Sequence, residues 1–338
     1  MTVVVLQVLN GLTIGAIYIL LASGLTIVFG LQGIVNVAHG VFYMLGAYLA
    51  LSLYPRVGFA LTLVIAFLVT ALLGLVLELA GVRTLVSWKR EGTQVLVLTL
   101  GVAIIASEVT KLIWGAVPQQ SEVPPALAGV VTVGPLSYPI YWLFVIAFTA
   151  VFMALLALAF YKTTLGILVQ AIALNRDIAE AMGTNAPRIS SMVFALGTGV
   201  AGMAGVLAGP ILSVYPTMCF DLLMILFVVV ILGGLGSLLG IVVSGMLIGL
   251  VNAFGVAYLT GTAGSIFAFA VMIGVLIFRP LGLFGRAGSL KCGAIGATRG
   301  SRRQRRPSHP RSSARASPAP RSLARRPRWS GRRDSRGT

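Results

Sequence analysis

Long runs of apolar residues, separated by short polar breaks, follow one another along most of the chain. A helix that crosses a bilayer needs about 20 mostly apolar residues, because a charged side chain at the bilayer centre costs roughly 2.5 to 3.5 kcal/mol. The runs therefore predict an all-α, polytopic transmembrane helical bundle of about eight or nine spans. They cover Val3–Phe29, Val35–Leu53, Leu61–Val82, Val95–Leu112, Tyr138–Phe160, Ile189–Leu212, Leu222–Leu239, Ile241–Leu259 and Ser265–Phe278.

The charged residues between these runs predict an orientation. If basic loops face the cytoplasm, three basic groups must share one side, and nine crossings with an external N-terminus satisfy that condition. The Pro-rich segment Val117–Pro135, which carries Glu122 and no basic residue, then lies outside. A re-entrant hairpin near 222–259 is the alternative to two crossings there, and it leaves the orientation unchanged. The basic groups are Arg83, Lys89 and Arg90; Lys162, Arg176 and Arg188; and Arg279 with Arg286.

Composition excludes a soluble domain. Hydrophobic residues make up 58% of the chain and charged residues only 10%, with a mean hydropathy of +0.99, which is too apolar for a hydrated surface. The net charge of +17 is concentrated, because sixteen of the 25 lysines and arginines lie in Arg286–Thr338. Two cysteines, Cys219 and Cys292, provide neither a disulfide framework nor a metal-ligand cluster.

We expect residues 1–286 to form the transmembrane domain and residues 287–338 to form a disordered tail. The tail is rich in Arg, Ser, Pro, Ala and Gly, a composition that cannot bury a core. A frameshifted reading of GC-rich DNA, without function, is the preferred interpretation. Attraction to anionic lipid is the next, and nucleic-acid binding is the least expected.

Glycines four residues apart occur as Gly11/Gly15, Gly205/Gly209, Gly236/Gly240 and Gly245/Gly249. Lipid supplies no hydrophobic drive between helices, so close approach through small residues contributes much of the packing. We expect these pairs to pack helices inside one subunit, and dimerisation through one of them is the alternative.

The segment Tyr161–Arg188 is an interruption whose own pattern is that of an amphipathic helix. Gly183 supplies a C-terminal stop, and Asn185 and Pro187 break the chain before the next run. A short amphipathic helix on the cytoplasmic face can lie in the lipid interface or dock into a groove of a soluble partner. Its few basic residues are balanced by two acids, which weakens the lipid interpretation. Docking, an interfacial helix and a plain linker remain open.

The segment Gly30–Gly40 places glycines, Gln32, Asn36 and His39 between two strongly apolar runs. Discontinuous helices expose backbone polar groups at membrane depth, where they can line a polar path without a buried charge. A translocation path or gate at Gln32, Asn36, His39 and Gly40 is therefore one interpretation. A tight turn with Asn36 as a cap and His39 satisfied by the backbone is the other.

Two carboxylates, Glu78 and Glu108, lie within apolar runs, where ionisable residues are candidates for function. Both are near span ends, within reach of water, Arg83 or Lys111, and we favour a structural role. The chain has no Ser/His/Asp constellation, no GxxxxGK[ST] loop and no metal-ligand spacing. We therefore expect neither catalysis nor a cofactor or metal on this chain, and energy must come from elsewhere.

Glycine-rich motifs follow one another along the chain. Taken together they strongly resemble the LivH-type permeases of branched-chain amino acid ABC importers, over about residues 6–286. Any one of these motifs is weak evidence, whereas four in the family's order are strong. The motifs are Gly11–Gly30 with Asn36-Val-Ala-His-Gly40, Gly199–Leu207, Leu232-Gly-Gly-Leu-Gly-Ser-Leu-Leu-Gly240 and Arg279–Arg286.

The resemblance implies a subunit of a multi-pass importer in the bacterial cytoplasmic membrane. Its implied partners are a second homologous permease, two cytoplasmic ATPase subunits that bind ATP, and a periplasmic or lipid-anchored binding protein that delivers a small amino acid. Gly166–Gly183 then resembles the coupling helix received by the ATPase. The residues that carry this assignment are Gly166, Arg176, Asp177, Ala179, Glu180, Ala181 and Gly183.

The chain departs from the family pattern at two positions, which keeps alternatives open. Val41 follows His-Gly where an acidic residue is common, and Leu79 follows Glu78 where arginine is usual. Urea, short amides or another small polar solute are therefore alternative cargoes for the same machinery.

A self-contained channel or secondary transporter is the alternative from another class. Such a protein usually carries charges at mid-membrane, and the predicted spans hold almost none.

Overall fold

The computed structural model describes residues 2–33, 36–87, 92–134, 136–258, 261–279 and 282–284, which belong to one compact unit. The predicted tail 287–338 lies outside the described residues, as do Lys89, Arg90, Arg286 and Cys292.

The described chain is a bundle of helices, as the apolar runs predict. Six of its helices are long and apolar enough to cross a membrane, and α7, α10 and the described part of α12 are shorter apolar helices. A two-stranded antiparallel hairpin, β1–β2, is an addition that the hydropathy pattern did not predict. The elements are α1 Thr2–Gln32, α2 His39–Val57, α3 Phe59–Leu77, the π-helical turn η1 Glu78–Val82, α4 Arg83–Ser87, α5 Gly92–Trp114, η2 Pro125–Leu127, β1 Val130–Val133, β2 Leu136–Pro139, α6 Ile140–Lys162, α7 Thr164–Leu174, α8 Arg176–Ala181, α9 Ala186–Ala208, α10 Met218–Gly233, α11 Leu238–Tyr258 and α12 Gly261–Phe278.

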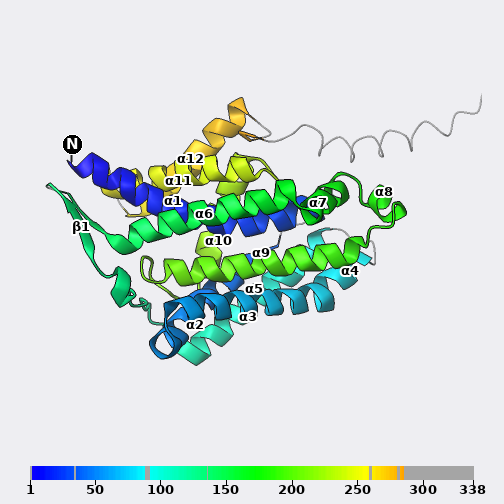
Figure 1. Ribbon diagram of the computed structural model, residues 1–338, viewed down its shortest axis with the longest axis horizontal. Coiled ribbons are helices and arrows are strands. Elements are labelled where there is room, and N and C mark those ends of the chain that lie inside the picture. Colours follow the sequence, from blue (N-terminus) through cyan, green and yellow to red (C-terminus); the bar gives the residue numbers. More distant parts are fainter. Residues whose placement is uncertain are drawn as a thin grey trace, which may run out of the picture. The chain divides into compact units, whose positions relative to one another are not determined.

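The bundle has two distinct ends. The β1–β2 hairpin and the N-terminus of α1 lie at one, and α4, α7 and α8 lie at the other (Figure 1). We call them the hairpin end and the α8 end. The chain after α12 returns to the end of α10, where the Leu283 N–H donates to the Leu232 carbonyl at 2.8 Å. Gly236, just beyond, approaches Gly30 near the end of α1.

Two predicted runs differ from the helices that replace them. The run Val35–Leu53 becomes α2, which begins only at His39, and the run Leu222–Leu239 becomes α10, which begins at Met218 and ends at Gly233. Helix α11 is long and apolar enough to span by itself. Helix α10 is shorter, so the choice between two crossings and a re-entrant hairpin at residues 222–259 stays a prediction.

Glycine contacts hold the long helices together within this one chain. Gly11 and Gly15 of α1 pack against Gly245 and Gly249 of α11, so closely that a Cβ atom at Gly15 would lie 2.9 Å from the Gly245 carbonyl oxygen. Gly205 of α9 lies against the backbone of Tyr43 in the same way. The prediction that the glycine pairs pack helices inside one subunit is confirmed for these contacts.

Replacing Gly15 with leucine should therefore destabilise the bundle. Overpacking of this kind costs about 1–3 kcal/mol, and we expect the midpoint of thermal unfolding in detergent to fall by about 5 °C. The matched control is Gly101→Leu in α5, because a Cβ atom at Gly101 meets no other group within 4 Å. Equal unfolding temperatures for the two variants would contradict the α1–α11 packing.

Candidate functional site

Three side-chain caps shape the chain between α6 and α9. Thr163 begins α7, where its Oγ1 accepts from the Gly166 N–H at 3.2 Å. Asn175 ends α7 and begins α8, since its Oδ1 accepts from the Ile178 N–H at 3.1 Å. Asn185 caps α9 through the Arg188 N–H at 3.2 Å. Short polar residues that compete for backbone donors thus divide one amphipathic pattern into two short helices.

Three of the residues predicted to couple with an ATPase face inward or shape the backbone. Gly166 lies against the Phe160 carbonyl, where no Cβ atom would fit. Ala179 is buried with Ile172 and Ala186. Gly183 has φ +87° and ends α8, a left-handed position that glycine adopts without strain. These roles explain the residue types, and contact with an ATPase stays a prediction.

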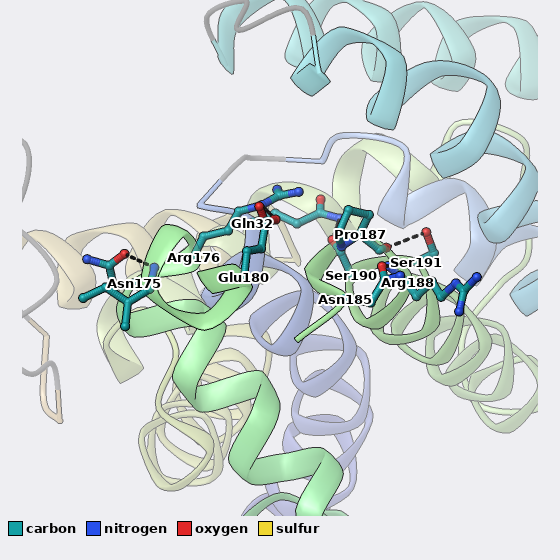
Figure 2. A network of polar contacts seen from close by, with 10 residues as sticks. Gln32, Asn175, Arg176, Glu180, Asn185, Pro187, Arg188, Ser190 and Ser191 are labelled. Atoms are coloured by element: carbon teal, nitrogen blue, oxygen red, sulfur yellow. Dashed lines mark hydrogen bonds and ion pairs between the residues drawn. The ribbon is translucent and has the colours of Figure 1, made fainter. Parts of the chain in front are cut away.

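The other predicted coupling residues are exposed on α8. Arg176 and Glu180 form an ion pair with Nε and Oε1 2.9 Å apart (Figure 2), and both remain partly open to solvent. Asp177 and Ala181 are exposed as well. A surface pair of this kind contributes at most about 1 kcal/mol of stability, so it leaves both charges available to a partner.

An apolar surface beside these charges was not among the predicted site residues. Leu174 is 84% exposed, Ile178 is 62% exposed and Met182 is 83% exposed. Leu174 is the last residue of α7, Ile178 lies in α8 and Met182 directly follows α8. The extended backbone of Asn175 separates Leu174 from α8, so the sequence spacing alone did not indicate this surface. We call Leu174, Ile178 and Met182 the α8 face.

The first turns of α9, which follow α8 in the chain, form hydrogen bonds with two other parts of the bundle. Ser190 Oγ accepts from Gln32 Nε2 at the end of α1 at 2.9 Å, and both residues are drawn in Figure 2. The next residue, Ser191, donates to Glu78 Oε2 at 2.6 Å. Glu78 is only 3% exposed and lies in the π-helical turn after α3. These adjacent serines therefore hydrogen-bond α9 to the end of α1 and to the π-helical turn that follows α3.

The two candidate carboxylates differ in their surroundings. Glu78 accepts a hydrogen bond from Ser191 and has no ion-pair partner among the described residues, so Arg83, one of the options considered for it, is not its partner. Glu108 has the expected partner, because Lys111 Nζ lies 2.6 Å from its Oε1.

Helix α2 begins halfway along the bundle. Gly197 is the middle residue of α9 and packs against Gly24 of α1, and the His39 ring lies beside Gly24. His39 Nε2 donates to the Leu21 carbonyl at 3.2 Å. Between the end of α1 and the start of α2 at His39, the described residues 33 and 36–38 are not helical.

Side chains satisfy the backbone of this non-helical segment. The Val37 N–H donates to Thr99 Oγ1 of α5 at 3.2 Å, and the Ala38 N–H donates to Asn36 Oδ1 at 3.0 Å. Non-helical backbone inside an apolar bundle persists only where such partners exist. Two polar atoms, Asn36 Nδ2 and His39 Nδ1, remain buried without a hydrogen-bond partner among the described residues.

Helix α10 begins at the same level. Gly40 packs against the backbone of Cys219. The segment before α10 returns from the hairpin end, where Val214 pairs with Gln119, and Ser107 Oγ of α5 donates to the Pro216 carbonyl at 2.8 Å. Helix α2 then runs toward the hairpin end and α10 toward the α8 end. We call Asn36–Gly40 and Tyr215–Asp221 together the mid-bundle junction.

The predicted path residues do not all meet. Asn36, His39 and Gly40 lie in the mid-bundle junction, and all three are buried. Gln32 lies at the α8 end instead, eight residues along α1 from Gly24, or about 12 Å. A role of these residues in a path or gate stays a prediction. Within the described residues, no group of three or more His, Cys, Asp or Glu side chains is placed to hold a metal ion.

Three related proteins are permeases of branched-chain amino acid transport systems. The BraD permease protein of the high-affinity branched-chain amino acid transport system of Pseudomonas aeruginosa is 31% identical over 300 residues, covering 83% of this chain and 95% of BraD. The LivH permease protein of Escherichia coli K12 is 29% identical over 296 residues, with the same coverage. A probable LivH permease of Methanocaldococcus jannaschii is 26% identical, covering 79% of this chain and 88% of that protein. No solved structure matches the chain.

A family described as the permease component of branched-chain amino acid transport systems matches residues 7–276. That match covers most of the chain and nearly all of its described helices, and it agrees with the apolar spans. The relatives are transport permeases, and the resemblance found in the glycine-rich motifs is confirmed. The chain therefore belongs to the family of branched-chain amino acid transport permeases and is a multi-pass membrane protein.

Proposed function

We propose that this chain is a permease subunit of an ATP-driven importer for branched-chain or similar small amino acids in the bacterial cytoplasmic membrane. It pairs with a second homologous permease, two ATPase subunits dock at the α8 end, and a periplasmic or lipid-anchored binding protein delivers substrate at the hairpin end. The observation that carries the proposal is the exposed α8 face, at the end of the bundle that also holds the basic loops.

The α8 face is suited to a protein groove. Its three apolar side chains lie outside the helices long enough to span a membrane. A surface helix that binds anionic lipid usually carries many basic residues, whereas here Arg176 is balanced by Asp177 and Glu180. Exposed apolar side chains among balanced charges suit a protein groove better than a lipid surface.

Orientation supports the same placement. Arg83, Lys162, Arg176 and Arg188 all lie at the α8 end of the bundle, and Glu122 precedes the hairpin at the other. Basic loops of membrane proteins face the cytoplasm, where ATP is available. The sequence contains no nucleotide-binding loop of its own, so we assign ATP to the partner subunits.

The contacts of α9 supply a route for the mechanical step. Movement of α8 would shift the first turns of α9, which Ser190 and Ser191 bind to α1 and α3. Farther along, Gly197 packs on Gly24 beside His39. Rigid helices joined in this way move together, so closure of the ATPases would reach the mid-bundle junction as a rigid-body change.

Reversing the character of the α8 face should uncouple the importer. We expect Ile178→Lys to prevent co-purification of the ATPase subunits and to lower amino acid uptake in proteoliposomes at least tenfold, because a charge replaces an apolar contact in a groove. The matched control for ATPase co-purification is Val130→Lys on β1, an exposed valine at the opposite end of the bundle, where no ATPase is proposed to dock. Normal ATPase co-purification by Ile178→Lys would contradict the docking assignment.

Removing only the donor of the Ser191–Glu78 hydrogen bond should destabilise the protein more than removing both partners. Ser191→Ala leaves a buried carboxylate without its donor and should cost about 1–3 kcal/mol, measured as a lower unfolding temperature in detergent. Adding Glu78→Leu should restore part of the loss, since both polar partners are then absent. Ser190→Ala is the control and should cost less, because its bond to Gln32 is only partly buried. Identical stability of Ser191→Ala and the unsubstituted protein would exclude this link.

A further inference from the structure

Asp221 lies in the first turn of α10, inside the mid-bundle junction. Two residues earlier, Cys219 packs against Gly40, and the ring of the preceding residue, His39, lies beside Gly24 of α1, which packs on Gly197 in the middle of α9. Asp221 is therefore close to the middle of the bundle's length. Its side chain is nevertheless exposed on the surface of this chain, as are Thr217 one turn before it and Met224 one turn after it.

The surroundings of Asp221 differ from those of the other carboxylates in the described spanning helices. Glu78 is buried and bonded to Ser191, and Glu108 is paired with Lys111. Asp221 Oδ2 accepts one hydrogen bond, from Tyr215 Oη at 2.9 Å. No described lysine or arginine lies within ion-pair distance of it. Carboxylates at such positions in spanning bundles almost always face a partner, the bundle interior or a water-filled cavity instead of lipid tails, because the charge is costly there.

Tyr215 links Asp221 to the core of the bundle. Its ring is half-buried and packs against the core that contains Tyr18 of α1 and Tyr43 of α2. Its hydroxyl donates to one oxygen of the Asp221 carboxylate, while the Asp221 side chain remains exposed.

We propose that Asp221, oriented by Tyr215, receives the α-ammonium group of the amino acid as it crosses between the exposed side of α10 and the second permease. This inference rests on the proposed function and adds a residue to it. A carboxylate only accepts hydrogen bonds, and an ammonium group offers three donors and the opposite charge. A neutral solute such as urea would leave the carboxylate uncompensated in the path, so the site favours a zwitterionic or cationic solute.

The experiment uses the complete importer in proteoliposomes, with its binding protein outside and ATP inside, and measures L-leucine imported per ATP hydrolysed. Asp221→Asn keeps an acceptor for Tyr215 and removes the charge. We expect it to lower leucine import per ATP about tenfold or more, the size of a lost charge-assisted hydrogen bond, with normal assembly and binding-protein-stimulated ATP hydrolysis. Asp221→Glu should regain part of the import. Glu108→Gln, which removes a carboxylate already paired with Lys111, should retain most of it.

Each other outcome has a defined meaning. Unchanged leucine import by Asp221→Asn, beside a working unsubstituted importer, overturns the ammonium subsite and leaves the proposed function intact. Loss of the second permease from the purified Asp221→Asn complex also overturns it, because Asp221 would then be an interface contact. A lower unfolding temperature with normal import per ATP would make Asp221 a stabilising charge at a helix N-terminus only. If the unsubstituted complex imports no amino acid, the proposed function itself fails.

Discussion

A polar backbone group inside a lipid bilayer must find its partner within the protein, and this requirement governs the arrangement of the bundle. Two helices, α2 and α10, begin halfway through it instead of at a surface. The chain tolerates these starts because the side chains of Thr99, Asn36 and Ser107 form hydrogen bonds with backbone groups of the non-helical segments that precede α2 and α10. The result is a junction of helix N-termini, polar side chains and unwound backbone where a fully helical bundle would have offered only apolar surface.

Helix α9 joins that junction to the α8 end. Its first turns bond α1 and α3 through Ser190 and Ser191, its middle residue Gly197 packs on α1, and Gly205 lies on the backbone of α2. From Gly197 to its end it is buried throughout. A helix so closely packed through glycines cannot slide past its neighbours without moving them. In the proposed function, a force applied at α8 would be carried toward the mid-bundle junction by packing that the small residues make possible.

The features that depend on local residue patterns could be predicted from the sequence, whereas those that depend on how distant segments meet in the fold could not. Hydropathy indicated the spans, caps and glycine spacing indicated the α7–α8 segment, and the glycine pairs of α1 and α11 meet as expected. The start of α10 was misplaced at Leu222, because an apolar window begins only after Asp221. Residues 213–221 lie between two predicted apolar runs, so hydropathy assigned them to a loop, whereas the structure brings this segment back to the middle of the bundle. Asp221 was thereby overlooked, and the hydroxyl of Ser191 was not predicted as the partner of Glu78, because the two lie 113 residues apart in the sequence.

The central claim, that the starts of α2 and α10 meet at a polar path at mid-membrane, is most directly tested by the solvent accessibility of Thr217. A spin label at Thr217→Cys, in a Cys219→Ala and Cys292→Ala background, is compared within the assembled importer with one at Leu68→Cys, the exposed middle residue of α3. The account predicts that the Thr217 label collides with a water-soluble nickel complex more often than with oxygen, and that the Leu68 label shows the reverse. Two labels with the same oxygen-dominated, lipid-like accessibility would contradict it.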